Sequence, residues 1–284
     1  MGSRRAIWTV CALLALSAPS AAPAAVVDLR AVVPGHGAVT YLDLLKQAIP
    51  DLADSADDKQ VEGHLAKSLR HIAGDANGGD PPDPIVIGLV EAVRIHSGGH
   101  PRLAILADLG HTDDRVAGTS LLALFDDAPT PHLLDAVDVA MDRDTSFSEH
   151  ERLPLGAGQE ALITYSEHSN SSQTYGFHTL IFVRHDRLAL LEQIFTLSSR
   201  ECGWQRTEDP TFTVRPDPHS PYGQLEVAVR VALKRDKTED CDTPAPRPYV
   251  RTYRAAYRWD DGSQKFVTPS VQLKRLWKIN QANF

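Results

Sequence analysis

Three side chains with the chemistry of a hydrolytic site fall within one predicted pair of strands. A turn centred on Ser172 would place Ser166 opposite His178, with His168 two residues along on the same face. A serine hydroxyl beside an imidazole is the beginning of a nucleophile and base pair. The sequence shows neither an acid to orient the imidazole nor a Gly-x-Ser-x-Gly turn, so polar residues on a solvated sheet face are the alternative interpretation.

Two histidines flank a glycine turn at which they would be able to share a metal ion. His96 and His100 stand on either side of Ser97-Gly98-Gly99, and imidazole is the commonest protein ligand of metals. The two glycines oppose a helix, so the histidines would have to meet at the neck of a hairpin. A pair of exposed loop histidines is the alternative. The sequence identifies no cofactor.

Aromatic residues and an arginine occupy alternate positions near the carboxyl end of the chain. Alternate residues of a strand share one face, so these side chains would form a stacking surface with a cation. Such a surface suits sugars, peptides or anionic glycans, although aromatic and arginine pairs also stabilise ordinary sheets. The residues of this predicted binding face are Tyr249, Arg251, Tyr253, Tyr257 and Trp259.

Residues 1–24 have the pattern of a cleaved signal peptide. Two arginines precede an apolar stretch from Ala6 to Ala18, and Ala22-Pro23-Ala24 matches a small-x-small cleavage site. As a helix this apolar stretch would be roughly 20 Å long, whereas the hydrocarbon core of a bilayer is about 30 Å thick. We therefore expect a periplasmic or secreted protein that does not span the membrane once the signal is removed.

Two cysteines remain after that cleavage, Cys202 and Cys241. An even pair in an oxidising compartment is most simply explained by one structural disulfide. A reactive thiol pair is the alternative, but the sequence holds no Cys-x-x-Cys and places no histidine beside either residue.

Charge is distributed unevenly along the 284 residues, whose formal net charge is −8. An acidic chain is repelled by phosphates, so nucleic acid is not an expected partner. Residues 245–284 nevertheless hold eight basic side chains against two acidic ones. We expect this basic end to pack against the acidic remainder of the chain. Binding to an external partner, either another envelope protein or an anionic glycan, is the alternative.

The spacing of apolar residues predicts an α+β fold. Capping patterns at Thr40 and Ser55 indicate a helical hairpin over 38–74, followed by a loop rich in glycine and proline, and together these make up a region of residues 25–84. Alternation from residue 85 onward predicts a mainly antiparallel β-sheet domain over 85–284, with hairpins at Ser97-Gly98-Gly99 and Asp261-Gly262 and a meander over 161–197. A closing C-terminal helix is expected over 270–280, while the segment 133–141 fits a helix or a strand.

The leading functional hypothesis from the sequence is a non-enzymatic binding or interaction module of the cell envelope. The alternative is a hydrolase or metal-dependent enzyme that uses the histidine and serine clusters.

Overall fold

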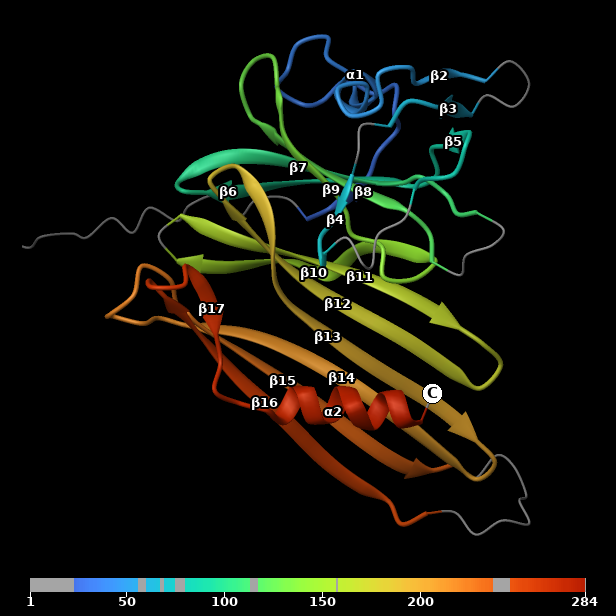
Figure 1. The fold of residues 1–284 in the computed structure, drawn as a ribbon, viewed down its shortest axis with the longest axis vertical. Helices are drawn as coiled ribbons and strands as arrows, with labels where there is room; N and C mark the ends of the chain where they lie inside the picture. The colour runs from blue at the N-terminus through green and yellow to red at the C-terminus, as the bar shows by residue number, and fades with distance from the viewer. Residues whose placement is uncertain are drawn as a thin grey trace, which may run out of the picture.

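Strands dominate the computed structural model, which describes residues 23–55, 60–66, 69–74, 80–112, 117–156, 158–236 and 246–283. These residues form three β-sheets and two helices (Figure 1). The predicted α+β class with an N-terminal helical hairpin is therefore wrong. The predicted signal peptide falls almost entirely on residues 1–22, outside the described residues. Neither helix is long and apolar enough to cross a membrane.

In the part of 38–74 that the structure describes, only the first helix of the predicted hairpin is present. Helix α1 (Tyr41–Leu45) begins with the expected capping box, in which the Thr40 hydroxyl accepts from the Asp43 N–H and the Asp43 carboxylate accepts from the Thr40 N–H. After α1 the chain enters a three-stranded sheet. Its strands, in spatial order, are β2 (Ala53–Asp54), β3 (Val61–Gly63) and β5 (Ile85–Val86).

The second predicted helix is replaced by extended chain in the described part of 55–74. The apolar residues at helical spacing do not share one face: Val61 is buried in one core, Ile72 is buried in another, and Leu65 is 65% exposed. Gly63 is unfavourable inside a helix and suits its place in β3, where a Cβ would lie 3.0 Å from the Asp51 side chain and 3.1 Å from that of Ile49. Apolar residues at intervals of three to four therefore pack into different layers here, and their helical spacing does not correspond to a helix.

A six-stranded sheet forms the middle layer of the molecule, and all its pairings are antiparallel except that of β4 with β9. The hairpin predicted at Ser97-Gly98-Gly99 is confirmed, and both glycines have positive φ angles. The ambiguous segment 133–141 contains a strand. In spatial order the strands are β1 (Ala25–Val26), β6 (Val90–Ser97), β7 (His100–Asp108), β8 (Ser120–Asp126), β9 (Leu133–Asp138) and β4 (Arg70–His71).

An antiparallel eight-stranded sheet follows, and each of its strands pairs with its neighbours in sequence. The predicted meander and the hairpin at Asp261-Gly262 are both part of it, whereas β10 and β14 were not anticipated. The strands are β10 (Asp144–Gly156), β11 (Gln159–Ser169), β12 (Gln173–Arg184), β13 (Arg187–Glu201), β14 (Trp204–Arg215), β15 (Gln224–Arg235), β16 (Tyr249–Asp260) and β17 (Lys265–Val267).

Alternating side chains of the six-stranded sheet fill two different cores. Ile105 and Leu121 face α1 and the N-terminal segments, while Leu106 and Leu122 face the eight-stranded sheet. A strand covered on both faces has no need of alternating polar residues. This explains the continuous apolar run of β8, in which every residue from Ser120 to Phe125 is buried.

The eight-stranded sheet encloses a third core, and two of its central strands, β13 and β14, separate along most of their length. Ile163 of β11 and Val229 of β15 belong to this core together with Leu276 of helix α2 (Gln272–Ala282). Strands β13 and β14 pair only between Ser199–Glu201 and Trp204–Arg206 and then separate. Helix α2, the predicted closing helix, lies across this part of the sheet (Figure 1).

Candidate functional site

The predicted serine and histidine pair is separated by the register of the sheet. Ser166 pairs with Phe177, and His178 pairs with Tyr165, so the observed register differs by one residue from the predicted one. Directly opposed residues share a face and a slip of one residue reverses it. Ser166 therefore faces the six-stranded sheet, whereas His178 faces the core of the eight-stranded sheet. The two side chains do not form a nucleophile and base pair.

Ser166 has structural partners. Its fully buried hydroxyl accepts from the Met141 N–H at 3.2 Å and lies 2.9 Å from the hydroxyl of Thr145. His168 is on the same face, and its Nδ1 lies 3.5 Å from an Asp142 carboxylate oxygen. These contacts connect β11 to the chain that enters β10.

His178 lines a cavity of about 910 Å³ between the edges of β10 and β14. Its ring is 4.6 Å from that of Tyr165 and 5.9 Å from that of Phe212, centre to centre, and its buried Nδ1 has no hydrogen-bond partner among the described residues. Burial lowers the pKa of His178 to about 4. The imidazole is consequently neutral near pH 7.

The predicted metal pair does not converge. His100 pairs with Ser97, and His96 pairs with Pro101, so the two histidines point to opposite faces of the hairpin. His96 is exposed and lies 3.3 Å from a carboxylate oxygen of Glu160. Within the described residues no group of three or more histidine, cysteine or acidic side chains is arranged to hold a metal ion.

The predicted aromatic binding face is divided between core and surface. Tyr257 is buried, and Trp259 and Tyr253 are packed against the same core. Tyr249 is 41% exposed, and the guanidinium of exposed Arg251 lies 5.5 Å from the centre of its ring. Of the five residues, Tyr249 and Arg251 are exposed, Tyr253 and Trp259 are half-buried, and Tyr257 is buried.

Cys202 lies in the turn between β13 and β14 and takes part in a disulfide bond. Its predicted partner Cys241 lies outside the described residues. The pairing of the two cysteines therefore stays a prediction.

Buried polar side chains occupy the place where β13 and β14 separate. Arg206 and Glu208 of β14 are in contact, and Asn280 of α2 joins them, accepting from Arg206 at 2.7 Å and donating to Glu208 at 2.7 Å. Burial is the main influence on Glu208 and raises its pKa, although Arg206 opposes the effect. The sequence held a signal for this cluster, since Asn280 continues the apolar helical spacing of Leu273, Leu276 and Trp277.

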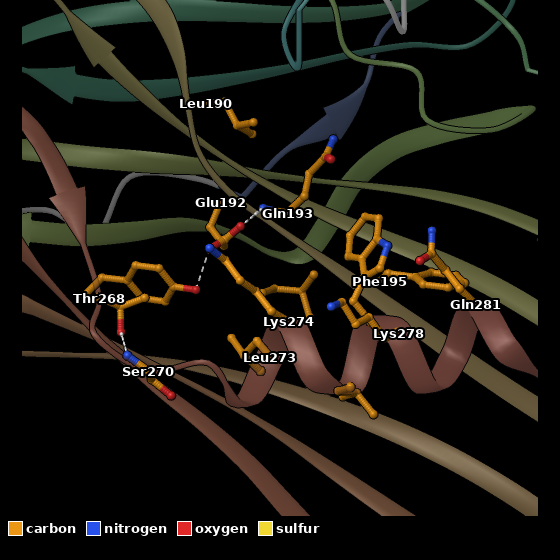
Figure 2. A pocket seen from close by; sticks show the side chains of 14 residues that line it. Leu190, Glu192, Gln193, Phe195, Thr268, Ser270, Leu273, Lys274, Lys278 and Gln281 are labelled. Carbon is orange, nitrogen blue, oxygen red and sulfur yellow. Dashed lines mark hydrogen bonds between the residues drawn. The ribbon is translucent and has the colours of Figure 1, made fainter.

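A cavity of about 400 Å³ lies between α2 and strands β13 and β16, and we call it the α2 cavity (Figure 2). Its apolar lining includes Leu190, Phe195, Leu273 and Trp277. The Trp277 ring packs edge-to-face against Phe195 at 5.3 Å and tilted against Phe177 at 5.9 Å, measured between ring centres.

Two lysines and a hydrogen-bonded acid complete the α2 cavity. Lys274 and Lys278 of α2 line it and are exposed. Glu192 accepts a hydrogen bond from the Tyr257 hydroxyl at 2.5 Å and one from the Gln193 N–H at 3.0 Å (Figure 2). Burial, followed by the charge of Glu192, raises the pKa of Tyr257, which keeps its proton. The predicted site residues included Tyr257 but none of the other members.

The basic end of the chain forms no ion pair with the acidic side chains that the structure describes, contrary to expectation. Among the described residues, none of its eight basic side chains forms an ion pair, and all eight are exposed. We call this set the basic segment. Its members are Arg247, Arg251, Arg254, Arg258, Lys265, Lys274, Arg275 and Lys278.

Comparisons of the chain with protein-family models, curated proteins and solved structures produced no match.

Proposed function

We propose that the chain is an exported, non-enzymatic binding protein of the cell envelope and that its basic segment binds an anionic glycan. The observation that carries the proposal is the contrast in ion pairing along the chain. Nine arginines between Arg30 and Arg230 form ion pairs with acidic side chains. The eight basic side chains of the basic segment form none in the described residues, so their charge is available to an outside anion.

The geometry of β16 supports a glycan over a compact anion. Tyr249 and Arg251 lie at one end of the strand on one face, and Arg254 and Arg258 lie on the other face, so the cations extend along the length of β16. The exposed Tyr249 ring with its neighbouring guanidinium offers a stacking surface for a sugar face. Export rests on the signal-peptide pattern of residues 1–24 and gives the protein access to envelope polysaccharides.

We do not propose the alternative hydrolase or metal-dependent enzyme. Ser166 and His178 face different layers, and His96 and His100 point to opposite faces of their hairpin. The proposed function needs no reacting group, because binding is supplied by surface charge and stacking.

The proposal is tested by measuring affinity for fluorescent dextran sulfate, with neutral dextran as the comparison ligand. A variant carrying Arg251→Gln, Arg254→Gln and Arg258→Gln should bind dextran sulfate at least about tenfold more weakly, and the affinity of the native chain should fall as salt is raised. The matched control replaces Arg30, Arg215 and Arg230, which are exposed but ion-paired, with glutamine. Equal loss of affinity in both variants, or equal binding of neutral dextran, would overturn the proposal.

A further inference from the structure

We infer that the α2 cavity binds a small amphiphile with a single alkyl chain and a carboxylate head group. This ligand is additional to the proposed glycan and does not depend on it. The cavity volume of about 400 Å³ lies within the range of small-molecule sites, which is about 300–1,000 Å³.

The apolar part of the ligand is indicated by the walls of the cavity. Leu190 is 37% exposed, although it stands beside a cavity that Phe195 and Leu273 also line. An exposed apolar surface next to a concave apolar wall marks a place where an apolar group can be removed from water. An alkyl chain seated between β13 and α2 would cover Leu190 and contact the ring of Trp277.

The anionic head group is indicated by the two lysines. Lys274 and Lys278 are four residues apart, so they lie on one side of α2, one turn from each other. Neither forms an ion pair with a described residue, and like charges at this spacing repel each other. A carboxylate placed at both ammonium groups would offset that repulsion and satisfy their hydrogen-bond donors.

Glu192 does not compete for the position of the head group. Its carboxylate already accepts from the Tyr257 hydroxyl and the Gln193 N–H, both groups of the protein itself. Two lysines therefore face one acid that has its own partners, and the charge of the cavity residues favours an anion. A cationic amphiphile of the same chain length would meet the unfavourable charge of both lysines.

The experiment is a titration of the intact protein with decanoate, decanol and decyltrimethylammonium, each below its micellar concentration, followed by calorimetry. Decanoate should bind most tightly, and octanoate should bind up to about fifteenfold more weakly because two fewer methylenes are buried. Tryptophan emission should change on decanoate binding in the native chain, and the change should be absent in Trp277→Phe. Equal affinity for all three head groups, or failure of decanoate to bind, would overturn the inference.

Two variants separate the head-group site from the apolar wall. The double variant Lys274→Gln with Lys278→Gln should bind decanoate about tenfold more weakly while its affinity for decanol stays within about twofold. Leu190→Asp should weaken the binding of both ligands. Leu65→Asp changes another exposed leucine, remote from the α2 cavity in the sequence, and should leave both affinities unchanged. If Leu65→Asp weakened binding as much as Leu190→Asp does, the ligand site would not be the α2 cavity, and the inference would be overturned.

Leu190→Asp distinguishes this inference from the proposed function, whereas Lys274 and Lys278 belong to both the basic segment and the α2 cavity. Leu190→Asp lies outside the basic segment and should bind dextran sulfate as the native chain does. Retained dextran sulfate binding without any decanoate binding would overturn the amphiphile site alone. Retained decanoate binding without dextran sulfate binding would instead overturn the glycan proposal.

Discussion

Asn280 donates a hydrogen bond to Glu208 at 2.7 Å, at the point where β13 and β14 separate. The same glutamate oxygen accepts from the Leu197 N–H of β13 at 3.1 Å, and the Asn280 amide also donates to the Phe195 carbonyl at 3.3 Å. Buried backbone groups have to be hydrogen-bonded. Side chains of β14 and α2 therefore satisfy backbone groups of β13 after the backbone ladder between β13 and β14 has ended.

Replacing Asn280 should be costly because its partners stay buried. Asn280→Leu removes the side chain that hydrogen-bonds to both Glu208 and Arg206. We expect the free energy of unfolding, measured with urea, to fall by about 2–4 kcal/mol. Asn283→Ala at the exposed end of the same helix is the control and should lose less than about 1 kcal/mol. Similar losses in the two variants would show that the buried cluster does not hold α2.

The pKa of His178 predicts a loss of stability in mild acid. The pKa falls from 6.5, the ordinary value, to about 4 in the folded protein, so the unfolded chain binds a proton more readily. The contribution of neutral His178 is fully present above pH 6.5 and is lost as the pH falls toward 4, by up to roughly 3 kcal/mol. Urea unfolding of His178→Phe across this range should show a correspondingly shallower decline. His219→Gln changes an exposed histidine and should decline as the native chain does; a native-like decline in His178→Phe would contradict the prediction.

Ser166→Ala tests the structural role of the serine. The Met141 N–H loses its acceptor in this variant, so we expect a loss of about 1–2 kcal/mol in thermal or urea unfolding. Ser166→Thr keeps an acceptor oxygen but adds a methyl group at a fully buried position, and its stability should also fall. An unchanged free energy of unfolding in Ser166→Ala would mean that the hydrogen bond to Met141 contributes nothing.

The disulfide prediction is checked by mapping peptides without reduction. A peptide joining Cys202 to Cys241 is expected, and Cys241→Ser should unfold at lower urea concentration because the bridge closes a long loop, with a cost of about 2–5 kcal/mol. Reduction should destabilise the native chain and leave Cys241→Ser unaffected. A Cys202 peptide linked to any other cysteine would refute the pairing.

Local sequence patterns predicted most of the strands of the second half. The alternation of Leu225, Val227 and Val229 marks β15 because one face of that strand is buried and the other is not. β14 was missed because its inward face carries Arg206 and Glu208 among aromatic residues. Their burial depends on Asn280, more than 70 residues later in the chain, and local spacing holds no information about that contact.

The candidate site also depends on contacts between strands, which local sequence patterns do not reveal. His178 could be named as a functional candidate from its type, but its face depends on a register that a single residue in the turn reverses. Tyr257 could be placed on an aromatic face, whereas its partner Glu192 belongs to another strand. The uneven distribution of charge was visible in the sequence, but only the structure shows that the basic segment has no ion pairs within the described residues.

The sequential order of β10 to β17 has a consequence for how the protein folds. Every pairing in that sheet joins consecutive strands, and the longest connection, residues 236–248 between β15 and β16, has 13 residues, so each pairing closes a loop at small entropic cost. The six-stranded sheet is different, because β1 must find β6 about 65 residues away and β4 must find β9 at a similar separation. We therefore expect hairpins of the larger sheet to gain hydrogen-exchange protection first during refolding, and the outer strands β1 and β4 to gain it last.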